Sequence, residues 1–339
     1  MAETTANTGA VFRKDRTGGI WFFLGRRLSI TLLTLFLVSL VTFLAFALIP
    51  GDPALLVLGI EASNEQVLAL RIEMGLDKSL PEQYWAWLGK FLSGDLGNSA
   101  RFRGASIAGL ILERLPVTFS LAILSLVFML LIAVPAVLVS VKKEGGIADR
   151  ILNTLTALNI SFPGFFLGVL FIWIFGIVLR LFVPGAYIDY RQDPLSFAAY
   201  LVFPALTLAL PNAAILVKFL RAQILQQLKL DYVRSALARG AGRRQVLYGH
   251  VLKNAAIPGI TLLGMIVGEI FAGSIVIEQV FAIPGIGRLL ISSITSRDYS
   301  TVQTLVVYMA FMVVLSNTLA DIIIRIIDPR ISAGSGGAS

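Results

Sequence analysis

The sequence of 339 residues contains no cysteine and only one histidine, His250. Without cysteine there is no disulfide framework, no Cys-ligated zinc site and no iron–sulfur cluster, and one histidine cannot supply a His-rich metal site. Zinc and redox chemistry are therefore not expected. We predict that the chain binds no metal and no cofactor of its own.

Charged residues are also scarce, at 14%, while 57% of residues are hydrophobic and the mean hydropathy is +0.84. A soluble domain is typically about half apolar and a quarter charged, so this composition argues against a soluble enzyme. Catalytic signatures are missing too. The only Gly-Lys pair, Gly89-Lys90, is followed by Phe91 and not by the Ser or Thr of a phosphate-binding loop, and neither HExxH nor GxSxG occurs. We expect no enzymatic activity in this chain.

The apolar residues form six stretches long enough to cross a bilayer, since a spanning helix needs about 20 residues. The first stretch lacks a small-residue cleavage pattern at its end and should stay as an anchor. Four prolines, Pro135, Pro163, Pro204 and Pro211, predict kinks. The sequence therefore predicts an all-α polytopic membrane protein with six transmembrane helices. These lie at 28–49, 117–141, 151–179, 197–217, 256–281 and 301–324.

The orientation follows from the basic residues, which stay on the cytoplasmic side of the membrane. Of the 28 Lys and Arg, 18 fall on the side of the two termini and 10 on the other side. The sequence predicts that both termini are cytoplasmic in a multi-pass protein of the bacterial inner membrane. The net charge of +8 is then a topology signal that involves membrane lipid and no nucleic acid.

Two hydrophilic segments are long, and the first of them, 50–116, is predicted to be external. The capping-box sequence Ser63-Asn64-Glu65-Gln66 and then Pro81 each open an amphipathic stretch, which predicts two short helices. Trp85 and Trp87 fit interfacial anchors better than a docking face for a partner.

The second long segment, 218–255, is predicted to be cytoplasmic and to form a helix, a glycine hinge at Gly240-Ala241-Gly242, and a second helix. Asp231 is a candidate N-cap and Gly240 a candidate C′ residue. The pairs at i, i+4 predict two amphipathic helices whose apolar faces are exposed on the inner side. A helix that simply rests on lipid would not need the hinge. His250 is interpreted as a satisfied structural histidine and not as a sensor.

Several short motifs, in a characteristic order, carry a resemblance to a known family. The N-terminal part holds Gly25-Arg26-Arg27-Leu28, Ile49-Pro50-Gly51-Asp52-Pro53, Gly75-Leu76-Asp77, Gly94-Asp95-Leu96-Gly97-Asn98-Ser99 and Phe162-Pro163. The C-terminal part holds Asp231 to Gly240, His250, Asn254, Pro258, Glu278, Pro284-Gly285-Ile286-Gly287-Arg288, Arg297-Asp298-Tyr299 and Asp328-Pro329-Arg330. From about residue 20 to residue 331 the chain resembles the permease subunits of binding-protein-dependent ABC importers, in the dipeptide, oligopeptide and nickel group.

The resemblance implies a type I ABC importer fold, in which this chain forms half of a translocation path. It implies four kinds of partner: a second homologous permease, two cytoplasmic ATPases that bind ATP and Mg²⁺, an extracytoplasmic solute-binding protein, and membrane lipid. The hinge segment would be the loop that couples to the ATPase, although Arg234-Ser235 replaces the usual Glu-Ala. Its candidate residues are Asp231, Tyr232, Arg234, Ala236, Arg239, Gly240, Gly242 and His250. An ATP-independent channel or secondary transporter is the alternative, supported only by acids within the spans.

Three acids within or at the ends of spans are candidates for function, because a charge at the bilayer centre costs on the order of 3 kcal/mol. Asp321 is interpreted as the i, i+4 partner of Arg325. Glu278 is a candidate for the path or for a structural hydrogen bond. Glu269 is a candidate for the path or for the permease interface, and the small residues of Gly264-x-x-x-Gly268 favour the interface slightly.

The same patterns divide the chain into four parts. We expect a disordered cytoplasmic tail (1–20), the first transmembrane helix with the external loop region (21–116), a five-helix permease core that contains the coupling loop (117–330), and a flexible C-terminal tail (331–339).

Overall fold

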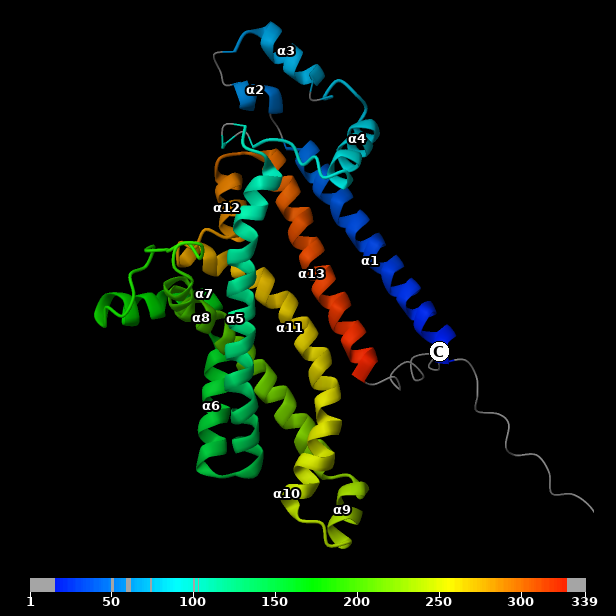
Figure 1. Ribbon diagram of the computed structural model, residues 1–339, viewed down its shortest axis with the longest axis vertical. Helices are drawn as coiled ribbons and strands as arrows, with labels where there is room; N and C mark the ends of the chain where they lie inside the picture. The colour runs from blue at the N-terminus through cyan, green and yellow to red at the C-terminus, as the bar shows by residue number, and fades with distance from the viewer. Residues whose placement is uncertain are drawn as a thin grey trace, which may run out of the picture.

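The computed structural model describes residues 16–49, 52–58, 62–73, 75–99, 101–102 and 104–327. Throughout these residues the regular structure is helical, and the helices form an elongated bundle (Figure 1). The short helices α2 to α4 lie at one end of the long axis, and α9 and α10 lie at the other. Pro50-Gly51, Asp328-Pro329-Arg330 and most of the two predicted tails fall outside the described residues.

Five long helices have the length and apolar composition of membrane spans. They contain five of the predicted stretches, apart from one or two residues at the ends of two of them. Most extend beyond the prediction, because polar residues at a helix end do not stop the backbone hydrogen bonds. Their bounds are α1 Arg16–Ala47, α5 Ile107–Lys142, α8 Pro194–Leu228, α11 Leu252–Val280 and α13 Tyr299–Ile327.

The third predicted span is not one straight helix: it is broken at Phe162, next to Pro163, where the sequence predicts a kink. It consists of α6 Ile147–Ser161 followed by α7 Gly164–Phe171 and the π-helical η1 Ile172–Val178, with a bend of 101° between the two halves. Phe162 has an extended backbone, with φ −95° and ψ 135°, because a residue before proline is disfavoured in the helical region. The structure therefore has five straight candidate spans and a sixth if the bent pair counts as one.

The core lies where α5, α8 and α11 pack against one another, and small residues of α8, Ala205, Ala209 and Ala213, are among its members. Pro204 and Pro211 lie within α8, and Pro135 within α5, without interrupting either helix. Asp193 caps α8: its carboxylate accepts hydrogen bonds from the Ser196 hydroxyl and from two backbone N–H groups, which lowers the pKa of Asp193. A second apolar cluster joins α12 Ile286–Thr295 to α5 and α13.

The two short helices predicted for the external segment are present as α3 Asn64–Glu73 and α4 Leu80–Leu92, after the shorter α2 Pro53–Leu58. The predicted capping box forms: the Ser63 N–H donates to Gln66 Oε1 at 3.0 Å and the Gln66 N–H to Ser63 Oγ at 3.3 Å. Tyr84 is buried and bonds to Ser39 of α1 across 2.9 Å, which docks α4 on the first span.

Candidate coupling segment

The segment from residue 218 to 255 begins as the last turns of α8, which continues eleven residues past the predicted end of its span. A short turn leads to α9, Asp231–Ala238. Tyr232 donates a hydrogen bond from its hydroxyl to Gln227 Oε1 at 2.9 Å and so fixes the angle between the two helices. Leu230, and not Asp231, is the N-cap, so that part of the prediction is wrong: Asp231 is the first helical residue, where its charge suits the helix N-terminus.

The glycine hinge ends α9 as predicted. Gly240 has φ +87°, the left-handed conformation that residues with a Cβ rarely adopt. Its N–H donates to the Leu237 carbonyl at 2.9 Å, and the Ala241 N–H donates to the Ala236 carbonyl at 3.1 Å. This pair of bonds is the Schellman motif, which satisfies the free carbonyls of a helix C-terminus. Gly240 is therefore the C′ residue.

After the hinge the chain re-enters the bundle through α10 Arg243–Val246 and the π-helical η2 Leu247–Val251, which runs into α11. Gly242 is the N-cap of α10 and has an ordinary φ of −67°. Lys142, at the end of α5, lies over the Tyr248 ring with its Nζ 5.2 Å from the centroid. The coupling segment, defined here as α9 to η2, thus contacts the body of the protein at both ends. The last turns of α8, which lead into it, are its α8 arm, and η2 is its other arm.

Most of the apolar face of the coupling segment is buried and not exposed, which corrects the sequence-based expectation. Its buried apolar residues belong to the main core cluster, and they are Val233, Ala236, Val246, Leu247 and Val251. The exposed surface of α9 is mainly polar, with the Asp231 and Arg234 side chains 96% and 77% exposed. Leu237, at 39%, is the large apolar side chain exposed on it. Arg239 and the hinge glycines lie beside them and are also exposed. His250 is exposed too, and its imidazole has no hydrogen bond within the described residues, so the interpretation as a satisfied structural histidine is not supported.

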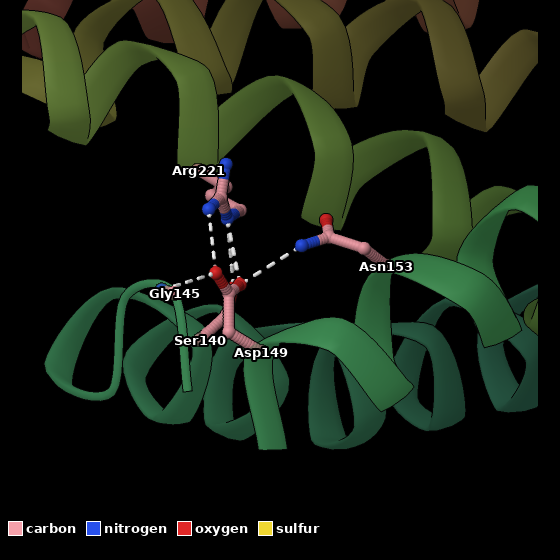
Figure 2. Close-up of polar contacts among 5 residues, drawn as sticks. All are labelled: Ser140, Gly145, Asp149, Asn153 and Arg221. Atoms are coloured by element: carbon pink, nitrogen blue, oxygen red, sulfur yellow. Dashed lines mark hydrogen bonds and ion pairs between the residues drawn. The ribbon is translucent and has the colours of Figure 1, made fainter. Parts of the chain in front are cut away.

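A buried ion pair fastens the α8 arm to the corner between α5 and α6 (Figure 2). Arg221 of α8 reaches both carboxylate oxygens of Asp149, through Nε at 3.0 Å and Nη2 at 2.8 Å. Asp149 also accepts hydrogen bonds from the Ser140 hydroxyl, the Gly145 N–H at 3.0 Å and Asn153 Nδ2 at 2.9 Å. Sequence reasoning counted Asp149 and Arg221 only as loop charges, because nothing in the sequence links two residues so far apart.

Glu278, a candidate for the translocation path, is fully buried and is bonded to its own chain. Thr118 donates its hydroxyl to Oε1 at 2.7 Å, and the Arg288 N–H donates to Oε2 at 3.1 Å. The Thr118 hydroxyl in turn accepts the Ile286 N–H at 2.9 Å. Gly285, the N-cap of α12, has no side chain to cap the helix, so Glu278 and Thr118 do it instead. The geometry favours the structural alternative over contact with a solute.

Glu269 lies on the exposed side of α11, so the chain itself provides no cover for this acid. Gly264 and Gly268 do not belong to that surface: both are buried, and a Cβ on Gly268 would lie 3.3 Å from Asn317 Oδ1 of α13. The small residues therefore serve packing within this chain, which removes the argument that they favoured a subunit interface. Glu269 belongs to a strip at helical spacing whose exposed members are Thr261, Met265, Glu269, Ala272, Val276 and Gln279.

Asp321 forms an ion pair with Arg27 and so joins α13 to α1, whereas the sequence suggested Arg325, whose side chain is outside the described part. A hydrogen bond of 3.1 Å between Thr31 and Thr318 lies next to this pair along the same two helices. The first span is thus attached to the last one.

Two family motifs meet at Asp298, which is 2% exposed. The Ser99 hydroxyl, at the end of the glycine-rich motif, donates to Asp298 Oδ2 at 2.5 Å, and Thr301 Oγ1 donates to the same oxygen at 2.7 Å. Arg101 extends the contact with Nη1 2.6 Å from the Ser292 carbonyl. These motifs build a joint between the external segment and the corner of α12 and α13.

The bundle of apolar helices, with a hinged polar segment at one end, defines a multi-pass membrane protein. Two family models together match nearly the whole chain: the binding-protein-dependent transport system inner membrane component at residues 132–333, and the N-terminal region of such membrane components at 20–122. The chain belongs to this family of inner-membrane ABC transport permeases.

The curated relatives agree with this assignment. A probable peptide ABC transporter permease of Sinorhizobium fredii is 35% identical over 306 residues, which cover 90% of this chain and 97% of the relative. A putative peptide transport system permease of Brucella abortus has the same identity and coverage. A glutathione transport system permease of Pectobacterium atrosepticum is 36% identical over 310 residues, or 91% of this chain and 98% of the relative. The resemblance found in the sequence motifs is confirmed.

Proposed function

We propose that this chain is one of two related permease subunits that together enclose the path of a peptide importer. An external binding protein delivers the solute, and two cytoplasmic ATPases drive uptake by alternating access. The substrate class is a small peptide, a proposal supported by the names of the relatives, which are peptide and glutathione permeases. The path itself would lie between the two permeases.

The observation that carries the ATPase contact is the hinged coupling segment. It projects from one end of the bundle, where α9 presents the exposed side chains of Asp231, Arg234 and Arg239 around the fixed Gly240 turn. The burial of the apolar face against the core fixes the segment to α8 and α11. A docked ATPase would therefore move these helices as a rigid body. Both termini and the coupling segment are cytoplasmic in this proposal, and the region of α2 to α4 is external.

Co-purification and reconstitution test the proposal. The chain is expressed with the neighbouring permease, ATPase and binding-protein genes, and the complex is reconstituted in liposomes. We expect the ATPase to co-purify, ATP hydrolysis to rise when the binding protein is added, and uptake of alanyl-alanine or glutathione to require ATP. Uptake that persists without ATP or ATPase would instead indicate a channel or secondary transporter. Mass spectrometry of the solute that co-purifies with the binding protein identifies the substrate directly.

A further inference from the structure

The corner between α5 and α6, here residues 140–153, is the only part of the described chain outside α8 and α11 that contacts both arms of the coupling segment through charged side chains. On the α8 arm the contact is between Arg221 and Asp149. On the η2 arm it is between Tyr248 and Lys142. The corner thus brackets the segment from the side.

The contact on the α8 arm is built to hold one geometry. Asp149 receives five hydrogen bonds from four residues, and its side chain is only 4% exposed, against 22% for Arg221. A bidentate pair between a guanidinium and a carboxylate fixes orientation as well as distance. Movement of Arg221 away from Asp149 would leave a buried carboxylate without its counter-charge, which is strongly unfavourable.

The backbone of the corner is shaped for the same contact. Gly145 has φ +71°, and this left-handed turn directs its N–H toward Asp149 Oδ2. Asp149 lies in the first turn of α6, where the helix dipole stabilises a negative charge. Ser140, in the last turn of α5, donates to Asp149 and accepts from Arg221 Nε at 2.8 Å. One carboxylate therefore ties together three helices.

The two contacts of the corner, Asp149–Arg221 and Lys142–Tyr248, are here called the bracket. They lie close to points at which the two arms can bend. Between the Arg221 contact and the body of the bundle, α8 contains Pro204 and Pro211. On the other arm the Tyr248 contact lies within the π-helical η2, and Pro258 of α11 follows it. Prolines and π-helical turns are places where helices bend. Arg221 lies between the prolines of α8 and the coupling helix α9. Without the bracket, a displacement of α9 would bend the helices at the prolines and the π-helical turn and would not reach the corner.

We propose that the Asp149–Arg221 pair is the positioning contact that makes the corner, and through it α5 and the bent α6–α7 pair, move together with the coupling segment. Neither residue touches the solute. They act by transmitting the displacement of α9 to helices that the ATPase does not contact. The inference rests on the proposed function, in which the ATPase docks at α9.

The first test measures distances in the complete importer with its partner permease, ATPases and binding protein. Because the chain has no cysteine, Arg150→Cys in the corner and Ser235→Cys in α9 supply two exposed sites for spin labels. We expect the distance between the labels to be the same in the nucleotide-free and ATP-trapped states. In an Asp149→Asn background this distance should change between states. A change in the otherwise unaltered protein would overturn the proposal.

The second test measures alanyl-alanine or glutathione taken up per ATP hydrolysed in liposomes. Asp149→Asn should keep assembly and stimulated ATP hydrolysis but lower this ratio about fivefold or more. Arg221→Lys keeps the charge but loses the bidentate geometry, and should give an intermediate ratio. Glu144→Gln removes an exposed acid from the same corner and should have no effect.

The outcomes separate the inference from the proposed function. A normal ratio of uptake to ATP hydrolysis in both Asp149→Asn and Arg221→Lys overturns the inference. Failure of both variants to assemble also overturns it, because the pair would then be structural only. If the unaltered chain recruits no ATPase, the proposed function fails instead.

Discussion

The carboxyl group of Glu278 occupies the space that a side chain on Gly285 would need. A Cβ placed on Gly285 would lie 2.2 Å from Glu278 Cδ, and one placed on Gly287 would lie 2.4 Å from Ile275 Cα. Real Cβ contacts are essentially never shorter than 3.0 Å. The two glycines of the Pro-Gly-Ile-Gly-Arg motif are therefore required by packing, so that the acid can cap α12 from inside the protein.

Replacing Gly285 by alanine should destabilise the permease, because either the new methyl group or the Glu278 carboxylate must move. Overpacking of this kind costs about 1–3 kcal/mol, and the carboxylate would also lose its bonds to Thr118 and Arg288. We expect a lower melting temperature in detergent, measured by thermal-shift size exclusion. Gly89→Ala is the matched control: nothing lies within 4 Å of its Cβ position, and alanine is the better helix former. Equal stability of the two variants would contradict the capping role.

Gly240→Val should weaken the coupling contact without blocking insertion, because no span is altered. A residue with a Cβ in the left-handed conformation costs about 1–2 kcal/mol, and a β-branched one is disfavoured further. We expect normal membrane levels, loss or loosening of the ATPase in pull-downs, and no stimulation of ATP hydrolysis by the binding protein.

Gly242→Val controls for bulk at the hinge. Both glycines have open space around them, but only Gly240 has a positive φ. Gly242→Val should therefore be milder, and Gly240→Asn, which tolerates the left-handed conformation, should recover part of the activity. Firm ATPase binding and normal transport by Gly240→Val would remove the coupling role from this segment.

Cysteine labelling decides the orientation. Asn64 is the first residue of α3, Gly242 lies at the hinge between α9 and α10, and both are exposed. The helix α3 and the pair α9 and α10 lie at opposite ends of the long axis (Figure 1). A single cysteine at Asn64 should react with an impermeant maleimide in intact cells, while one at Gly242 should react only after the cells are permeabilised. The reverse pattern would invert the predicted topology.

A charged side chain exposed to lipid within a span would cost on the order of 3 kcal/mol, so we expect Glu269 to face the path or the second permease. Glu269→Leu should therefore abolish or reduce transport. Transport loss with the complex intact indicates the path, and loss of the permease pair indicates the interface. Met265→Leu, in the same exposed strip, serves as the control. If Glu269→Leu assembles and transports normally, neither role holds.

Local patterns predicted what depends on neighbours in sequence. The capping box at Ser63 and Gln66, the C′ role of Gly240 and the apolar runs of five spans all follow from residues within a few positions of one another. The break at Phe162 and Pro163 was visible only as a kink, since sequence does not give the size of a bend.

What the sequence did not predict depends on residues that are far apart in the chain. Periodicity identified the apolar faces of the coupling segment but not what covers them, and Val233 and Val246 are in fact buried in the core. Neither the Asp149–Arg221 pair nor the partners of Glu278 leave a local signature. Glu269 is exposed on the surface of the isolated chain, which fits a position facing the path or the second permease but does not decide between them.

The 101° bend between α6 and α7 also affects how the chain meets the hydrocarbon layer. If the two helices are one span, the final turn of α6 ends inside the bilayer, and the carbonyls of a helix's last turn have no partner within that helix. Lipid tails offer no donors, so irregular backbone at that depth persists only where another protein surface or water covers it. In that case the break at Phe162 lies where water or a neighbouring protein surface contacts the third span. Three large exposed side chains border the break: Phe162, Phe165 and Phe166.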